Sequence, residues 1–348
     1  MEEETNLTIT GSDQSSPFID LPIPPDGELY AGIDVGTNSV KMVIGDLAKG
    51  RANRIYDKTI ITRLGEGMQA LGGRLREDAM LRSLDALAEL AEAARVHKTI
   101  ATAAVGTAAL RDASNREDFL RRAQERCGLR IEVIPGEEEA RLSYLAGRRD
   151  PQWRDVTHLR VIDIGGGSTE IIEGIPYSDS VGSRISVNYG AVKLTETFLK
   201  SDPPTIAQLE EAASAVQAAF ERIDRQALVS SDSQGEAFGG QGEFVLVGVG
   251  GTVTNLGAMD QGGRSAIALR HGHLLTAERL GTLIDLLATS TIAQRRMIPG
   301  LDPRRADIIL GGAILLSQAL ARLNAPAVAI STRGLRWGLL YDRFALIK

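Results

Sequence analysis

The chain has 348 residues, is 43% apolar and carries a formal charge of −6, which is long enough for two domains with full cores. No apolar run approaches the roughly 20 residues that a membrane-spanning helix needs. The acidic start, with no apolar segment after it, is unlike a signal peptide. We therefore expect a cytoplasmic protein with no membrane partner. Cys127 is the only cysteine, which excludes an intramolecular disulfide and a cysteine-based metal site.

The negative charge is concentrated at the N-terminus. Residues 1–27 hold six acidic residues and no Lys or Arg, which leaves 39 basic and 39 acidic residues in the remainder. Because this segment is proline-rich and lacks periodicity, we predict a disordered acidic tail. Nucleic-acid binding normally needs a strongly basic face. The remainder of the chain has no basic run, so we expect no nucleic-acid partner.

The first half after the tail mixes strands and helices. Hydrophobic periodicity predicts strands over 28–34, 40–47, 55–62, 99–105 and 129–134, and helices over 78–96, 106–115, 115–127 and 135–149. We assign residues 28–150 to a first domain.

The second half repeats this mixture over a second domain, residues 151–332. The patterns predict strands over 158–165, 170–175, 183–188, 244–249 and 327–331, helices over 193–199, 205–228, 250–259, 276–290, 303–323 and 335–344, and loops over 230–242 and 262–273. We expect the C-terminal helix, within 335–348, to pack back on the first domain.

A glycine-rich turn stands near the middle of the chain, where a strand runs into Gly165, Gly166 and Gly167 and continues through Ser168 into a second strand. Successive glycines let the backbone turn its N–H groups inward, as in loops that bind phosphate. Asp163 and Glu170 flank the turn, and Mg²⁺ takes one or two carboxylates together with substrate phosphates. An isolated glycine hairpin without function would have the same pattern.

The turn does not stand alone, because residues 33–45 resemble residues 162–174. At an offset of 129 the same residue types recur in matched pairs: Ile33 and Ile162, Asp34 and Asp163, Gly36 and Gly165, Ser39 and Ser168, Gly45 and Gly174. Such an internal repeat predicts a duplicated fold whose two turns face each other across a cleft.

Three further segments are candidates for binding or catalysis. Gly250, Gly251 and Thr252 follow a buried strand, and ligands bind at such strand ends in open α/β sheets. A helix that begins after the strand at 99–105 would favour an anion near Arg111, although a solvated surface arginine has the same pattern. His271 and His273 form a pair that could hold a metal, but no third ligand is near them in sequence.

Three consecutive acids, Glu137, Glu138 and Glu139, open the helix at 135–149. Each offsets the helix dipole by about 0.3–1 kcal/mol, and this effect accounts for the three acids as well as a chemical role does. Successive helix positions point about 100° apart, so at most one of the three can face a cleft.

Taken together, the motifs resemble the exopolyphosphatase and guanosine pentaphosphate phosphohydrolase (Ppx/GppA) family in a short two-domain form. The likeness covers about residues 28–345 and rests on six motifs in order: 34–39, 110–111, 136–141, 162–170, 250–253 and 299–309. The resemblance implies an α/β fold with two ribonuclease-H-like domains around an inter-domain cleft, as in the actin-like, sugar-kinase and heat-shock ATPase superfamily.

The resemblance also implies site residues. Glu139 falls on the catalytic glutamate, and Asp34, Asp163 and Glu170 fall on the acids that hold Mg²⁺, with another divalent cation or K⁺ as an alternative activator. The implied phosphate-binding residues lie in three glycine turns and one helix: Gly36, Thr37, Asn38, Ser39, Arg111, Gly165, Gly166, Gly167, Ser168, Gly250, Gly251 and Thr252.

The implied activity is the release of terminal orthophosphate from inorganic polyphosphate or guanosine pentaphosphate by a cytoplasmic homodimer. A long polyanion would need a track of arginines leading out of the cleft. The candidates are Arg141, Arg148, Arg149, Arg270, Arg295, Arg296, Arg304 and Arg305. Two alternatives stay open: an ATP-dependent kinase or ATPase of the same superfamily, and a non-catalytic sensor that binds guanosine tetraphosphate or pentaphosphate.

Overall fold

The computed structural model describes residues 28–47, 53–222, 244–263 and 271–344. The predicted tail at 1–27, the predicted loop at 230–242 and Arg270 lie outside these ranges. No helix in the described ranges combines the length and apolar character needed to cross a membrane.

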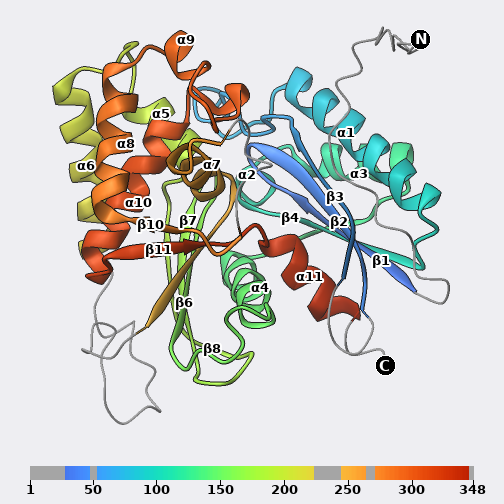
Figure 1. The fold of residues 1–348 in the computed structure, drawn as a ribbon. Coiled ribbons are helices and arrows are strands. Elements are labelled where there is room, and N and C mark those ends of the chain that lie inside the picture. The colour runs from blue at the N-terminus through green and yellow to red at the C-terminus, as the bar shows by residue number, and fades with distance from the viewer. Residues whose placement is uncertain (1–27, 48–52, 223–243, 264–270, 345–348) are drawn as a thin grey trace, which may run out of the picture.

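Two β-sheets form the frame of the molecule (Figure 1). The first sheet has the order β3-β2-β1-β4-β5. Its strands are β1 (Leu29–Val35), β2 (Ser39–Asp46), β3 (Asn53–Ile61), β4 (Ala101–Gly106) and β5 (Ile131–Val133). Strands β1, β4 and β5 run parallel, and β2 pairs antiparallel with β1 and with β3.

The second sheet repeats that arrangement and has the order β10-β11-β9-β6-β7-β8. Its strands are β6 (Leu159–Ile164), β7 (Thr169–Gly174), β8 (Val181–Val187), β9 (Val245–Val249), β10 (Leu274–Thr276) and β11 (Ala327–Ile330). Strands β6, β9 and β11 run parallel, and β7 pairs antiparallel with β6 and with β8. The antiparallel pairs β1–β2 and β6–β7 are the two hairpins that the sequence repeat predicts.

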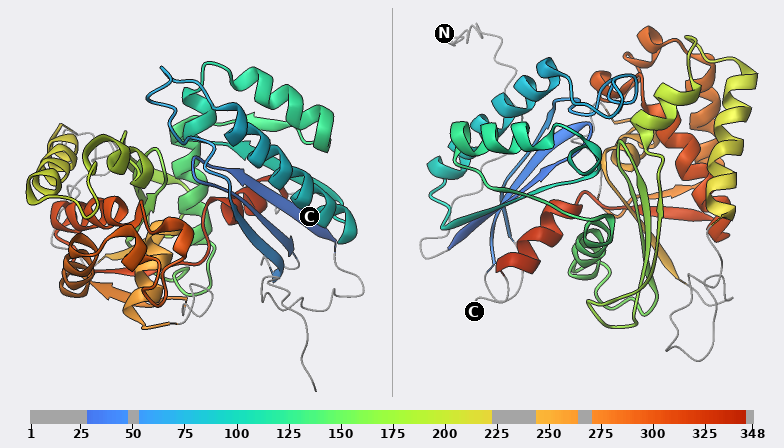
Figure 2. Two further views of the ribbon diagram at one scale, coloured as in Figure 1. Left: turned by 90° about the horizontal axis from the view of Figure 1, so that it is seen from above. Right: turned by 180° about the vertical axis from the view of Figure 1, so that it is seen from behind.

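Helices cover the outer faces of both sheets (Figures 1 and 2). The first sheet packs against α1 (Glu77–Val96) and α3 (Arg116–Cys127) through a buried cluster that includes Leu84, Leu87 and Phe119. The second packs against α5 (Ala191–Phe198), α6 (Ile206–Glu221), α8 (Ala277–Thr289) and α10 (Ile309–Leu323). Further helical elements are α2 (Ala108–Asp112), α7 (Gly251–Asp260), α9 (Ile292–Arg295) and the 3-10 turn η4 (Pro303–Arg305). We call each sheet with its outer helices a lobe.

Two central helices, α4 (Gly136–Arg148) and α11 (Leu335–Phe344), lie between the sheets and join the lobes (Figure 1). Helix α11 packs on the first sheet, where Phe344 stacks on Tyr30 with ring centroids 4.7 Å apart. Helix α4 packs on the second sheet through Ala140 and Tyr144. The two helices meet so closely that a Cβ on Gly338 would lie 1.8 Å from the Leu142 carbonyl oxygen.

The predicted elements differ from the structure in three places. The predicted helix at 303–323 is broken, because the Asp302 side chain accepts a hydrogen bond from the Arg304 N–H at 3.0 Å and α10 begins only at Ile309. The short strand β10, which pairs with β11, was not predicted, and residues 264–270 of the predicted loop at 262–273 lie outside the described ranges. Helix α9 was not predicted; its N-cap Thr291 and Gln294 form a capping box.

Candidate active site

A cavity of about 50 Å³ opens between the lobes, where three glycine turns meet. The first turn is 36–39 after β1, the second is 165–168 after β6, and the third is 250–252 after β9. The cavity is lined by Asp34, Gly36, Thr37, Asn38, Ser39, Lys41, Thr107, Ala108, Glu139, Asp163, Ile164, Gly165, Gly166, Gly167, Ser168, Ala191, Gly250, Gly251, Thr252, Arg305, Ile308 and Leu335. The structure thus brings together all the predicted site residues except Arg111 and Glu170.

The first two turns have the same internal geometry. Gly36 N–H donates to the Ser39 carbonyl and Gly165 N–H donates to the Ser168 carbonyl, each at 3.0 Å. The turns also touch, since a Cβ on Gly166 would lie 2.9 Å from the Thr37 Cβ. This close approach requires glycine, and the lobes are therefore closed on each other at the cavity.

The third turn depends on Gly250, whose φ of 94° is a backbone conformation that favours glycine. A Cβ there would also lie 2.9 Å from Asp163 Oδ1. The turn feeds directly into α7, so the unpaired N–H groups of that helix's first turn lie at the cavity and favour an anion.

Glu139 is the acid of α4 that faces the cavity. Its neighbours Glu137 and Glu138 pair instead with Arg184 and Arg141, so only one of the three acids lines the cleft, as helical spacing predicts. Burial and the nearby Asp163 carboxylate raise the pKa of Glu139 to about 7, although Arg111 acts in the opposite direction. A carboxyl group with such a pKa can accept a proton near neutral pH.

Arg111 lies behind Glu139 and does not line the cavity. Its Nη1 donates to Glu139 Oε2 at 3.2 Å and to the Ile134 carbonyl at 3.2 Å. In this structure Arg111 therefore orients the Glu139 carboxylate, and its predicted contact with phosphate stays a prediction.

Asp163 and Glu170 face each other across the β6–β7 pair. Asp163 accepts a hydrogen bond from Ser143 Oγ at 2.7 Å, and Glu170 accepts one from Ser186 Oγ at 3.2 Å. Burial raises the pKa of both carboxyl groups, and the neighbouring acids raise that of Glu170 further. Glu170 Oε2 is buried and has no partner at hydrogen-bond geometry, although the nearby Ser168 side chain acts to lower the pKa of this carboxyl group.

Lys41 is a site residue that the sequence reasoning missed. It stands opposite Asp34 in the β1–β2 pair, and its Nζ lies 3.2 Å from Asp34 Oδ2. The signal that could have found it is its place in the repeat, where it occupies the position equivalent to Glu170. The first hairpin thus presents a cation to the cavity.

Arg305 is the only candidate of the predicted arginine track that lines the cavity among the described residues. Its guanidinium lies flat on Gly251, where a Cβ would come within 2.4 Å of its Cζ. Burial lowers its pKa, but an arginine stays charged in proteins. No group in the described ranges accepts a hydrogen bond from its guanidinium, so the guanidinium is available to an anion.

The other described arginines of that track have different surroundings. Arg141, Arg149 and Arg304 pair with carboxylates. Arg148 and Arg295 are buried and donate to backbone carbonyls, and Arg296 is exposed. Because Arg270 lies outside the described residues, the arginine track as a whole stays a prediction.

The surroundings of the predicted metal ligands differ between the histidine pair and the carboxylates. His271 and His273 contact separate acids, Asp150 and Asp260, and no group of three His, Cys, Asp or Glu side chains in the described chain could hold a metal alone. Mg²⁺ usually needs only one or two carboxylates beside substrate phosphates and water. The unpartnered Glu170 Oε2 beside Asp163 fits such an ion.

Comparisons with known proteins indicate the family of this chain. The Ppx/GppA phosphatase family model matches residues 43–346. Exopolyphosphatase 2 of Mycobacterium tuberculosis is 33% identical over 308 residues, which cover 85% of this chain and 91% of the relative. The guanosine-5'-triphosphate,3'-diphosphate pyrophosphatase of Photobacterium profundum is 30% identical over 326 residues, covering 93% of this chain and 61% of that protein.

Solved structures show the same architecture. The crystal structure of an exopolyphosphatase-like protein superposes with a TM-score of 0.81 at 31% identity and covers 91% of this chain and 98% of its own. This match confirms the predicted fold class of two α/β units around an inter-domain cleft. With a family model over most of its length and a relative that is 33% identical over 85% of this chain, the chain belongs to the Ppx/GppA phosphatase family.

Proposed function

We propose that the chain is a Mg²⁺-dependent phosphohydrolase that releases terminal orthophosphate from inorganic polyphosphate, from guanosine pentaphosphate or from both. The observation that supports it most is Glu139, a carboxyl group with a pKa near 7 that faces three glycine turns across one cavity. The names of the relatives, an exopolyphosphatase and a guanosine pentaphosphate pyrophosphatase, support these two substrates. A cytoplasmic location and a homodimer belong to the same proposal.

In the proposed reaction, Glu139 accepts a proton from a water molecule that attacks the terminal phosphorus. The bond from that phosphorus to the bridging oxygen breaks, and the products are orthophosphate and a chain one phosphate shorter. A positioned general base contributes about 10²–10⁴ in rate. Arg111 keeps the Glu139 carboxylate in one orientation through its contact at 3.2 Å.

The charges around the cavity suit a phosphate chain. Lys41 and Arg305 line it from opposite lobes, and the N–H groups of the glycine turns can donate to phosphate oxygens. Asp163 and Glu170 would hold Mg²⁺, which when bound neutralises charge on the reacting oxygens. Phosphoryl transfer depends mainly on such positioning and charge stabilisation.

The two alternatives from the sequence are less well supported. A kinase or ATPase would need room for an adenosine near Gly250 and Gly251, and the Arg305 guanidinium lies on Gly251. A non-catalytic sensor has no use for a buried acid of raised pKa at the cavity. ADP release from ATP, measured beside phosphate release from polyphosphate, separates the kinase from the hydrolase.

The decisive variant is Glu139→Gln, which keeps the shape of the side chain and removes the base. We expect kcat for phosphate release to fall by about 10²–10⁴ while the far-ultraviolet spectrum stays unchanged. The matched control is Glu137→Gln, because Glu137 is in the same helical turn, is exposed and pairs with Arg184. Near-normal turnover by the Glu139 variant would remove Glu139 from its role.

Substrate choice is tested by parallel kinetics. Phosphate release is measured on long polyphosphate, tripolyphosphate and guanosine pentaphosphate at equal concentrations of terminal phosphate and of Mg²⁺. We expect turnover of at least one of them. Tight binding of guanosine tetraphosphate without turnover of any phosphate substrate would favour the sensor instead.

A further inference from the structure

Arg63 has an unusual backbone and a fixed position beside the first glycine turn. It follows β3 with a φ of 54°, which is uncommon for a residue other than glycine and marks a position worth a functional explanation. Its N–H and that of Thr62 both donate to the Asn38 carbonyl, at 3.0 and 3.1 Å. The backbone of Arg63 is therefore bonded to the turn that lines the cavity.

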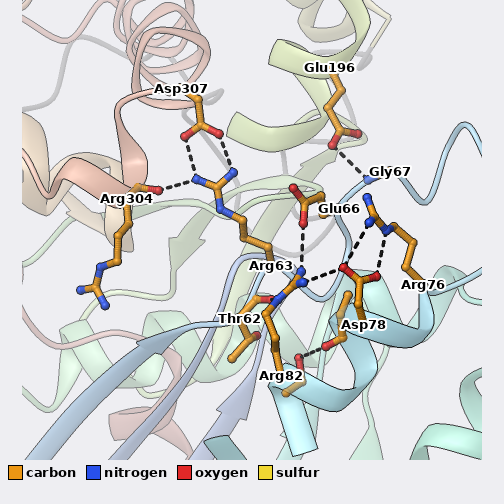
Figure 3. A network of polar contacts seen from close by, with 12 residues as sticks. Thr62, Arg63, Glu66, Gly67, Arg76, Asp78, Arg82, Glu196, Arg304 and Asp307 are labelled. Atoms are coloured by element: carbon orange, nitrogen blue, oxygen red, sulfur yellow. Dashed lines mark hydrogen bonds and ion pairs between the residues drawn. The ribbon is translucent and has the colours of Figure 1, made fainter. Parts of the chain in front are cut away.

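The side chain of Arg63 leaves its own lobe and reaches the other (Figure 3). Its Nη1 and Nη2 donate to the two carboxylate oxygens of Asp307 at 2.5 and 3.0 Å, and Nη2 also donates to the Arg304 carbonyl at 2.6 Å. This two-pronged geometry fixes orientation as well as distance. We call Arg63 and Asp307 the lobe clasp.

The segment that the clasp holds is the one that carries Arg305. Asp307 and Arg304 flank Arg305 in sequence, around the turn η4, and the Arg305 guanidinium lies on Gly251 of the third turn. Arg63 thus connects the first glycine turn to the segment that holds the Arg305 guanidinium at the third glycine turn. Asp307 pairs with no other cation in the described ranges.

The clasp lies at the boundary between the lobes, which must separate for a phosphate chain to enter the cavity. The cavity measures about 50 Å³, whereas binding sites for small molecules usually measure about 300–1,000 Å³. A phosphate chain with its cation therefore enters only if the lobes separate. Besides the clasp, Gly67 N–H donates to Glu196 Oε1 at 3.2 Å across the same boundary (Figure 3). Both contacts break when the lobes part.

We propose that Arg63 is a positioning residue for phosphate-chain binding: its pairing with Asp307 closes the lobes and holds Arg305 at the cavity. This role of Arg63 rests on the proposed function, because the ligand it helps to bind is the phosphate chain. The clasp residues are 30% and 28% exposed, so the pair is not strong enough to lock the lobes permanently. It can form and break with each binding event.

The test compares Arg63→Gln, Asp307→Asn and the double variant. We expect each single variant to raise KM about tenfold with kcat within about twofold, because a smaller closed population lowers apparent affinity. We expect the double variant to match either single one, since the two side chains act as one unit. The control is Arg121→Gln, which removes an exposed arginine paired only within α3.

A second readout does not depend on turnover. Spin labels on the two lobes, in a chain whose Cys127 is replaced by serine, report the distance across the cleft with and without tripolyphosphate. We expect the parent to close on adding tripolyphosphate and both clasp variants to stay more open. If the parent hydrolyses nothing, the proposed function fails while these distances still test the clasp. An unchanged KM, additive single effects or unchanged lobe distances in the variants would overturn the clasp.

Discussion

The two hairpins beside the cavity share a backbone but differ in charge. Position 34 plus 129 is 163, and position 41 plus 129 is 170. In the first hairpin Asp34 stands opposite Lys41, and in the second Asp163 stands opposite Glu170. The facing pair in the first hairpin is therefore neutral, whereas the facing pair in the second consists of two acids.

This difference assigns separate tasks to equivalent positions. Two buried carboxylates that face each other repel, and burial raises the pKa of both. A divalent cation relieves that repulsion, so the second hairpin is the proposed metal side. Lys41 already satisfies Asp34 at 3.2 Å, so the first hairpin is suited to meet phosphate oxygens instead.

Among changes to the hairpins, the largest effect is expected from Glu170→Gln, which leaves Asp163 as the only acid of the facing pair. We expect kcat to fall by about 10³, similar to the loss of a preorganised charge-stabilising group, and Mg²⁺ to raise the melting temperature less than in the parent. Phosphate release and thermal melts with and without Mg²⁺ measure this. The control is Glu173→Gln on the same strand, where Glu173 pairs with Arg160. Normal, Mg²⁺-dependent turnover by the Glu170 variant would place the metal elsewhere.

The next largest effect is expected from Lys41→Met, which removes the charge that distinguishes the first hairpin. We expect kcat/KM to fall by about 10- to 100-fold, mainly through KM, because a phosphate-binding charge is lost. Stability should fall by about 3 kcal/mol because Asp34 becomes an uncompensated buried charge. Steady-state kinetics and urea unfolding measure these two changes. If KM stays normal, Lys41 serves only to neutralise Asp34.

The pH dependence of stability gives a smaller effect with a definite sign. Glu139 has a pKa near 7 in the folded chain and an ordinary value of 4.5, so the folded state binds its proton more tightly than the unfolded state does. Its contribution to stability is therefore fully present below about pH 4.5 and is lost as pH rises toward 7.

We expect the melting temperature of the metal-free protein to fall by a few degrees between pH 5 and 7.5. Mg²⁺ should raise the melting temperature more at pH 7.5 than at pH 5, because cations bind deprotonated carboxylates. Differential scanning fluorimetry in chelator and in Mg²⁺ measures both changes, and Glu139→Gln should flatten the metal-free curve. A melting temperature that rises with pH in chelator would contradict the raised pKa.

Much of this arrangement could be predicted from the sequence, because glycine turns and hydrophobic periodicity are local signals. The offset of 129 located both hairpins, and the carboxyl ends of parallel strands placed the third turn beside them. The repeat is recognisable at positions where the two hairpins have identical residue types. The position that distinguishes their charges, Lys41 in the first and Glu170 in the second, is not one of these.

The remaining features depend on contacts between distant residues. Arg63 and Asp307 are 244 positions apart, and neither has a local pattern that indicates its partner. The apolar spacing across 303–323 predicted one helix, yet the turn at Pro303–Arg305 directs Arg305 into the cavity. Glu170 matched an acidic motif position, but only the structure shows that it lies behind the cavity and not on its wall.

The smallest effect is expected from Ser143→Ala. Ser143 stands one helical turn after Glu139 and donates to Asp163 Oδ2 at 2.7 Å, so it orients Asp163. The equivalent acid of the first hairpin, Asp34, is paired with Lys41 instead. A net hydrogen-bond contribution of about 1 kcal/mol corresponds to a fall of about fivefold in kcat. Ser83→Ala is the control, because Ser83 is equally buried and donates within its own helix to the Ala79 carbonyl. If kcat is unchanged in Ser143→Ala, strand pairing alone orients Asp163. In that case Lys41 and Glu170 alone account for the functional difference between the two hairpins.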